Sequence, residues 1–165
     1  MAIQVSKMTV TDWPDVCSIY EEGIATGNAT FDHFAPTWEQ WDRTHLPAGR
    51  LVARENGKIT GWAALTRVSQ RPCYAGVAEL SVYVASWARS QRIGSSLMKA
   101  AIESSEEAGI WTLQGSIFPE NPASLRLCES HGFRLVGYRE RVGRLKDEWR
   151  DTILVERRSP IVGIS

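Results

Sequence analysis

The sequence lacks the features that mark several large classes of protein. Its three cysteines, Cys17, Cys73 and Cys128, are odd in number, widely spaced and never in a CxxC pair, so neither a disulfide framework nor a structural zinc site is indicated. No sign of charge is in excess, because 19 Lys and Arg residues balance 19 Asp and Glu residues. Zero net charge gives no support for nucleic acid or an anionic membrane as partner, although a local basic patch stays open.

Long apolar runs and targeting signals are missing as well. No uncharged apolar run has the length that a membrane-spanning helix needs. The opening residues, MAIQVSKMTV, lack the basic cap and apolar block of a secretory signal. We therefore expect a cytoplasmic protein with no membrane partner. The histidines His33, His45 and His131 are scattered, so we also expect no metal site.

The composition is that of an ordinary globular chain. Of the 165 residues, 43% are hydrophobic and 23% are charged, a balance that fits neither a disordered nor a fibrous chain. The sequence has no internal repeat and no low-complexity stretch. We expect one domain over residues 1–158 and a loose C-terminal tail over 159–165, where Pro160 and Gly163 stand.

Apolar spacing predicts an α/β chain. A first helix is expected to be capped by Asp12, and Asn56-Gly57 predicts a hairpin turn. The expected strands lie near 3–5, 51–55, 59–65, 77–84, 111–117, 134–142 and 149–155, and the later helices near 37–45, 93–109 and 122–130. This order predicts a mixed sheet covered by helices. In the strand 77–84, Leu80, Val82 and Val84 should face one way and Glu79, Ser81 and Tyr83 the other.

The segment from Glu79 to Ser96 joins a strand to a helix through a polar, basic turn. Free N–H groups at a helix N-terminus attract anions, and Arg89 and Arg92 add positive charge there. A pyrophosphate would fit such a site. The other interpretation is a solvated turn in which Gly94 simply opens the helix.

Two segments resemble motifs of the Gcn5-related N-acetyltransferase (GNAT) superfamily. The acetyl-CoA loop of that family, Gln/Arg-x-x-Gly-x-Gly/Ala, reads here Arg89-Ser90-Gln91-Arg92-Ile93-Gly94, with Arg92 in place of the first glycine. The segment 121–133 is similar to the family's N-x-x-S-x-x-L-Y-E-x-x-G-F motif, which flanks the pantetheine arm. The resemblance implies the acyl-CoA N-acyltransferase fold, a mixed, mostly antiparallel sheet flanked by helices, with acetyl-CoA as co-substrate. The implied cofactor-binding residues are Val82, Tyr83, Val84, Arg89, Ser90, Gln91, Arg92, Ile93, Gly94, Ser95, Asn121 and Ser124.

Within the superfamily, the chain resembles phosphinothricin and methionine sulfoximine acetyltransferases, which acetylate the α-amine of small amino acid analogues. The residues that carry this resemblance are Ile19-Tyr20, Thr30-Phe31, Arg71-Pro72, Glu79, and Trp149 with Asp151. It implies that Phe31 lines the substrate pocket and reaches across a homodimer interface. Packing in the chain's own core is the competing interpretation of Phe31.

Three further residues are candidates for the chemistry. Glu79 is expected to be the general base, since burial can raise the pKa of a strand carboxylate toward neutrality; a structural ion pair is the alternative. Cys128 stands where relatives often have a tyrosine that protonates the departing thiolate, yet it fits equally well as a small buried apolar residue. Arg71 can hold a substrate carboxylate through two hydrogen bonds, or it can be a surface charge.

The sequence therefore predicts an acetyl-CoA-dependent N-acetyltransferase acting on a small amino acid or analogue. Two alternatives stay open. One is transfer to another amine, such as a polyamine, an aminoglycoside or a protein N-terminus. The other is an acyl-CoA-binding sensor without catalysis. The absence of an acidic run weakens the case for a polycationic substrate.

Overall fold

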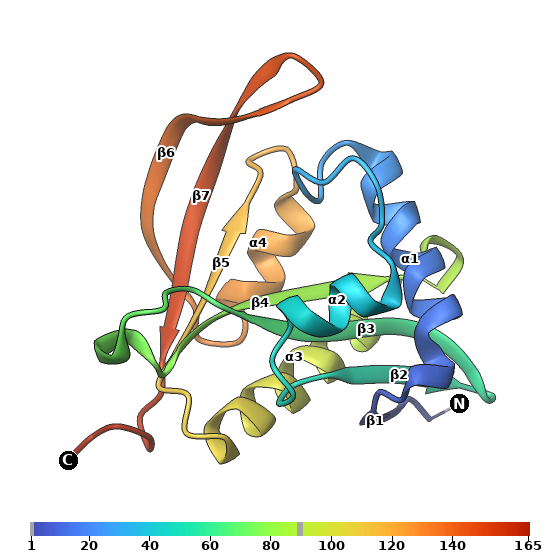
Figure 1. The fold of residues 1–165 in the computed structure, drawn as a ribbon, viewed down its shortest axis with the longest axis horizontal. Helices are drawn as coiled ribbons and strands as arrows, with labels where there is room; N and C mark the ends of the chain where they lie inside the picture. Colours follow the sequence, from blue (N-terminus) through green and yellow to red (C-terminus); the bar gives the residue numbers. More distant parts are fainter. Residues whose placement is uncertain (1, 89–90) are drawn as a thin grey trace.

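The computed structural model describes residues 2–88 and 91–165, and their strands form one seven-stranded sheet (Figure 1). The strands lie in the order β1-β2-β3-β4-β5-β7-β6. Their bounds are β1 (Gln4–Lys7), β2 (Leu51–Glu55), β3 (Lys58–Arg67), β4 (Val77–Val84), β5 (Thr112–Ile117), β6 (Arg134–Leu145) and β7 (Glu148–Arg158). Every neighbouring pair is antiparallel except β4 with β5, which run parallel. This confirms the expected mixed, mostly antiparallel sheet.

Helices cover both faces of this sheet (Figure 1). In the described part of the chain they are α1 (Trp13–Thr26), α2 (Trp38–Thr44), α3 (Gln91–Glu107) and α4 (Pro122–Glu129). On one face, α1 and α2 pack on a core that contains the fully buried Trp41 and Trp62. On the other face, Leu97 of α3 and Cys128 of α4 belong to two further apolar clusters. Full burial of a large apolar side chain such as Leu97 stabilises the fold by roughly 1.5–3 kcal/mol.

Strand β4 divides its side chains between these two faces as predicted. Leu80, Val82 and Val84 pack with the cluster around α3, whereas Tyr83 packs with the cluster around α1 and α2. Because side chains alternate along a strand, Glu79 shares the face of Tyr83. The carboxylate proposed as the base is therefore on the α1/α2 side of the sheet.

Two local predictions have different outcomes. Asn56 and Gly57 take the left-handed conformation, with φ of 52° and 77°, and form the predicted turn between β2 and β3. Asp12 occupies the N-cap position of α1 as predicted, but its side chain makes no capping hydrogen bond to that helix. Its carboxylate instead accepts the backbone N–H of Thr9 at 2.8 Å and pairs with Arg54 of β2.

The C-terminal hairpin is longer than its apolar pattern indicates. Strands β6 and β7 extend to Leu145 and Arg158, with register shifts within β6. The hairpin projects from the rest of the fold (Figure 1). Residues 159–165, expected to be loose, receive hydrogen bonds from the Arg158 guanidinium at the carbonyls of Val162 (2.8 Å) and Gly163 (2.6 Å).

The only parallel pair in the described sheet opens after three residues. On one side β4 pairs with β3 from Ala78 to Val84, but on the other side it pairs with β5 only from Val77 to Glu79. From Leu80 onward, the β4 edge that faces β5 has no ladder partner among the residues that the structure describes. Glu79 thus stands at the point where the two strands part.

Candidate active site

Glu79 combines a half-buried carboxylate with polar neighbours from the next strand. Burial raises the pKa of Glu79 above its ordinary value, while hydrogen bonds with the side chains of Ser116 and Gln114 act to lower it. The net shift is upward because the desolvation of the charged form dominates. A carboxylate with a raised pKa is a stronger base, which suits proton abstraction near neutral pH.

Beyond Glu79, the open edge of β4 leads toward the first turn of α3. Backbone groups on such an edge can pair with the amides of an extended ligand as a strand would. Ile93 at the start of α3 is fully buried. A Cβ at Gly94 would meet Leu127 of α4 at 3.3 Å and Val84 at 3.9 Å. Helix α3 therefore begins close to β4 and α4, and the N-terminal end of a helix suits a pyrophosphate. These features fit acetyl-CoA.

The other proposed cofactor contacts are described only in part. Arg89 and Ser90 lie outside the described residues, and Gln91 is described only as the first residue of α3. Arg92 is exposed. The Ser95 hydroxyl lies 3.0 Å from Nε2 of His131, so it already has a partner within the chain.

Asn121 joins the α4 N-terminus to the loop after α1. Its side-chain oxygen accepts the backbone N–H of Ser124, and its amide donates to the carbonyl of Asn28, each at 3.3 Å. The role of Asn121 and Ser124 in binding pantetheine stays a prediction.

Cys128 is buried in the cluster beneath α3 and α4. Burial, with a smaller contribution from Glu129, raises the pKa of its thiol to about 11. An ordinary alkyl thiol has a pKa of about 8.5, so a proton transfer from Cys128 to a departing thiolate is uphill by about 3 kcal/mol. This cost favours the packing interpretation of Cys128 over the acid.

A polar cluster lies on the Glu79 face between α1, the α1–α2 loop and β4. The Tyr20 hydroxyl of α1 donates to the Asp32 carboxylate, and the rings of Tyr20 and Tyr83 lie 5.1 Å apart. Burial raises the pKa of Tyr83 to about 12, and the charges of Asp32 and Glu79 add to this effect. Space for the Tyr83 ring comes from Gly23, where a Cβ would lie 2.5 Å from a ring carbon.

Phe31 packs against its own chain. Its ring packs against the Phe118 ring in a T-shaped arrangement with centroids 4.9 Å apart, and a Cβ at Gly143 of β6 would come within 2.7 Å of the Phe31 ring. Behind this pair, the Arg150 guanidinium of β7 lies 4.1 Å from the Phe118 ring centroid and donates to Asn28 at 2.8 Å. Within one chain, Phe31 is therefore packed as a core residue would be. A role for Phe31 across a dimer interface stays a prediction.

The side-chain contact of Arg71 is with a residue outside the polar cluster. Arg71 is exposed at the start of the short turn η2 (Pro72–Tyr74), and its guanidinium lies 5.6 Å from the Tyr74 ring centroid. No contact in the described part of the chain joins Arg71 to Glu79, and its role with a substrate carboxylate stays a prediction.

Two residues that shape this region, Asp32 and Arg150, were not among the candidates expected from the sequence. Neither belongs to a motif quoted above, and each acts on residues of another element. For Arg150 the hydrogen-bond partners Gly27 and Asn28 are more than 120 positions away in the chain. The only signal was indirect, since Asp32 follows the Thr30-Phe31 pair and Arg150 stands between Trp149 and Asp151.

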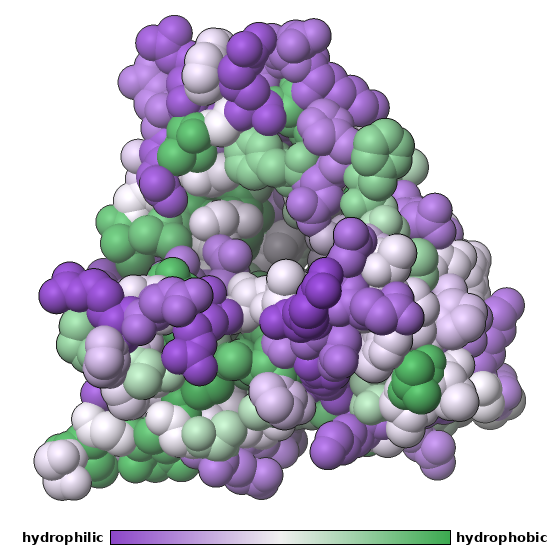
Figure 2. Space-filling view, in the orientation of Figure 1, coloured by the Kyte–Doolittle hydropathy of each residue, from purple (hydrophilic) through white to green (hydrophobic). Residues whose placement is uncertain are grey.

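The face that carries Glu79 is hollowed near its centre. Figure 2 shows this hollow where Figure 1 places α2 on one side and β5 on the other. Across residues 2–88 and 91–165, no group of three or more His, Cys, Asp or Glu side chains is placed to hold a metal ion. No helix among these residues is long and apolar enough to cross a membrane.

Comparisons with known proteins agree with the fold and the motifs. A phosphinothricin N-acetyltransferase of Alcaligenes faecalis is 35% identical over 153 residues, which are 88% of this chain and 77% of that protein. The crystal structure of a ribosomal-protein-alanine N-acetyltransferase from Brucella melitensis matches 94% of this chain and 99% of its own, with a TM-score of 0.85 and 28% identity.

A phosphinothricin acetyltransferase from Sinorhizobium meliloti, solved with acetyl-CoA, covers all of this chain and 92% of its own, with a TM-score of 0.89. At 22% identity it supports the fold alone. The family model for the acetyltransferase (GNAT) family matches residues 11–133, the stretch that holds Glu79, the open edge of β4 and both motifs. With that match, the chain belongs to the GNAT family of N-acetyltransferases.

Proposed function

We propose that this enzyme transfers an acetyl group from acetyl-CoA to the α-amine of a small amino acid or analogue of the phosphinothricin or methionine sulfoximine type. The observation that carries the proposal is the position of Glu79, a carboxylate of raised pKa where β4 and β5 part. Acetyl-CoA supplies a thioester carbonyl, and the open edge of β4 is where its pantetheine arm would lie.

The chain's own groups handle protons and charge. An amine attacks a thioester only with a free lone pair, so Glu79 accepts a proton from the substrate ammonium, directly or through one water. Backbone N–H groups of Val82–Val84 that point away from β3 donate to the carbonyl oxygen as its negative charge develops. The departing thiolate needs little help near its own pKa, which leaves no required step for Cys128.

Substrate selection is assigned to the hollow on the α1/α2 face. Phe31 supplies an apolar wall, and Arg71 supplies a guanidinium for the substrate carboxylate. The Arg71 side chain has no hydrogen bond in the described part of the chain, where it only lies over Tyr74. It can therefore turn toward a ligand without breaking an ion pair.

A homodimer is part of the proposal. Five large apolar side chains are exposed on the β6–β7 hairpin, namely Leu135, Val136, Tyr138, Val142 and Trp149. Strand β6 is also an edge of the sheet, and unpaired edges favour association. Phe31 touches Gly143 of this hairpin, so a second chain bound there would lie beside the proposed substrate pocket.

A cytoplasmic location stays a prediction.

A panel of amines tests the proposal. Purified enzyme with acetyl-CoA is given phosphinothricin, methionine sulfoximine, spermidine, an aminoglycoside and a peptide with N-terminal alanine, while release of thiol is followed. We expect turnover with the two amino acid analogues. Turnover with spermidine, the aminoglycoside or the peptide alone would instead assign another amine. Binding of acetyl-CoA without any turnover would indicate the sensor.

A further inference from the structure

His45 lies in a row with the proposed base across neighbouring strands. At the end of α2 its backbone is extended, with φ −107° and ψ 143°, and it forms an antiparallel bridge with Thr66 of β3. Thr66 is in turn the direct partner of Glu79 on β4. Directly paired residues place their side chains on the same face, and two strand spacings separate the Cα atoms of His45 and Glu79 by about 10 Å.

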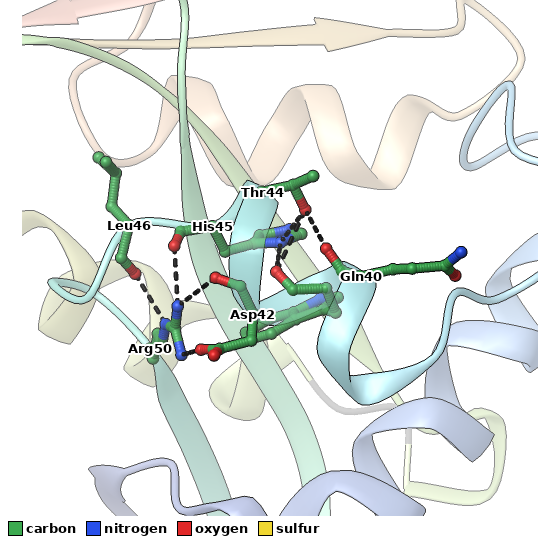
Figure 3. Close-up of polar contacts among 7 residues, drawn as sticks. Gln40, Asp42, Thr44, His45, Leu46 and Arg50 are labelled. Carbon is green, nitrogen blue, oxygen red and sulfur yellow. Dashed lines mark hydrogen bonds and ion pairs between the residues drawn. The ribbon is translucent and has the colours of Figure 1, made fainter.

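The contacts of the His45 ring define which nitrogen carries the hydrogen. Nδ1 lies 2.8 Å from the carbonyl oxygen of Trp41 and 3.0 Å from the hydroxyl of Thr44 (Figure 3). A carbonyl oxygen can only accept, so Nδ1 must donate, and in the neutral ring Nε2 keeps its lone pair. Within the described residues, Nε2 has no hydrogen-bond partner.

Arg50 fixes the end of α2 and with it the backbone of His45. Its guanidinium donates to the carbonyls of Leu46 and His45 at 2.8 Å and of Asp42 at 2.9 Å, and it pairs with the Asp42 carboxylate (Figure 3). The His45 ring stacks on Trp41 with centroids 4.1 Å apart and planes at 14°. The position of the His45 ring is therefore fixed by the hydrogen bond of Arg50 to the His45 backbone and by the stacking of Trp41 on one face of the ring.

The charges around His45 favour the neutral ring. Burial and the positive charge of Arg50 lower the pKa of His45, while the Trp41 carbonyl and the Asp32 carboxylate act to raise it. The net shift is downward. Of the remaining acids near it, Asp42 is engaged by Arg50, and Glu79 lies two strands away. At neutral pH, His45 is an uncharged base.

Acetyl transfer to an ammonium requires two protons to leave the nitrogen. The first must go before attack, and the second leaves when the new N–C bond has made the nitrogen positive again. The C–S bond breaks with its electron pair leaving on the thiolate sulfur. Because a carboxylate accepts only one proton, Glu79 cannot hold both protons in a single turnover. A second acceptor on the same face is needed unless the thiolate itself takes the proton.

We propose that His45 Nε2 accepts the second proton, directly or through one water, after Glu79 has accepted the first. The inference rests on the proposed function. Both groups return their protons to solvent before the next turnover. Both must be unprotonated in the free enzyme, so the acid limb of kcat/KM should reflect two enzyme groups.

The test compares the wild type with His45→Asn and the control His33→Asn at saturating acetyl-CoA. Asn keeps an N–H near the position of Nδ1, where it can donate to the Trp41 carbonyl, but it has no nitrogen at Nε2. His33 is exposed in the α1–α2 loop, and its one ring contact within the described residues is with Phe34, with ring centroids 6.4 Å apart. We expect His45→Asn to lower kcat/KM for the amine roughly tenfold to a hundredfold at neutral pH, and His33→Asn to leave it unchanged.

The pH profile separates catalysis from packing. The acid limb of the kcat/KM profile should depend on one fewer protonation step in His45→Asn than in the wild type, and the KM for acetyl-CoA should be unchanged. If the acid limb of the kcat/KM profile is the same in His45→Asn as in the wild type, the inference is overturned and the proposed function stands. If the wild type acetylates no amine, the proposed function is overturned and the inference with it. If His45→Asn does not fold, nitrogen NMR of the wild type decides. A neutral His45 protonated at Nδ1 supports the inference, and one protonated at Nε2 contradicts it.

Discussion

The proposed role of the Glu79 side chain as general base can be tested directly with its isostere. Glu79→Gln keeps the shape and removes the basicity, so turnover should fall about a hundredfold or more while acetyl-CoA binding stays nearly unchanged. Raising the pH should recover part of the rate, because more substrate amine is then neutral. Steady-state kinetics and calorimetric titration with acetyl-CoA measure the two effects. A matching loss of cofactor affinity would assign Glu79 to binding or folding.

The same substitution has a predicted effect on stability. A carboxyl whose pKa is raised by folding contributes stability that is complete below its ordinary pKa and is lost as the pH rises through the raised value. Glu79→Gln should therefore gain stability relative to the wild type as the pH rises from 4 toward neutral. Urea unfolding at several pH values measures this difference, and a difference that stays constant with pH would contradict the shift.

Arg92 stands where the family motif has its first glycine, and a series of substitutions at this position can show what its side chain does. If its charge meets a cofactor phosphate, Arg92→Ala should weaken acetyl-CoA binding, with an effect that shrinks as salt rises. Arg92→Gly restores the family residue. Tighter binding by Arg92→Gly indicates that the side chain crowds the backbone, and weaker binding indicates lost charge. Equal affinity of all three proteins, measured by titration, would remove Arg92 from the cofactor site.

Among the elements, the α1–α2 loop depends on the C-terminal hairpin. The Arg150 side chain, only 12% exposed, donates to the carbonyl of Gly27 and the side chain of Asn28, each at 2.8 Å. The same loop carries Phe31 and Asp32. Losing this anchor should let the loop move and weaken substrate binding, with a smaller effect on the proposed cofactor site, which the loop meets at the hydrogen bond from Asn121 to the Asn28 carbonyl.

Arg150→Met should therefore raise the KM for the amine about tenfold and change the KM for acetyl-CoA little. The control is Arg134→Met, at an exposed arginine of β6 that pairs with Glu156. Steady-state kinetics with each substrate varied in turn gives both constants. Equal increases in the two KM values would indicate a general loss of structure.

Elements with a strong apolar period were predictable from the sequence, and contacts between distant residues were not. The alternation in β4 and the Asn56-Gly57 turn depend on neighbours in the chain, so local pattern indicates them. The Asp12 carboxylate was assigned to its own helix, yet it binds Arg54, which reaches it only when β2 lies beside it. Arg150 and His45 likewise contact segments that are distant in the sequence, Arg150 the loop after α1 and His45 strand β3.

For the whole molecule, we expect a dimer formed through the β6–β7 hairpin. Trp149→Asp places a charge at a side chain that is 57% exposed on the hairpin, and it should shift the sedimenting mass from two chains to one. The control Ile164→Asp makes the same kind of change at a 68% exposed residue of the C-terminal segment and should leave a dimer. A wild type that sediments as one fully active chain would contradict the shared pocket and leave Phe31 as a core residue.

The most direct measurement is the identity of the acetylated product. The enzyme is given acetyl-CoA and an equimolar mixture of phosphinothricin, methionine sulfoximine, spermidine and a peptide with N-terminal alanine, and mass spectrometry locates the added acetyl group. We predict acetyl on the α-nitrogen of the amino acid analogues, and its loss with Glu79→Gln. Acetyl found only on spermidine or the peptide, or product that forms equally fast with Glu79→Gln, would contradict the account.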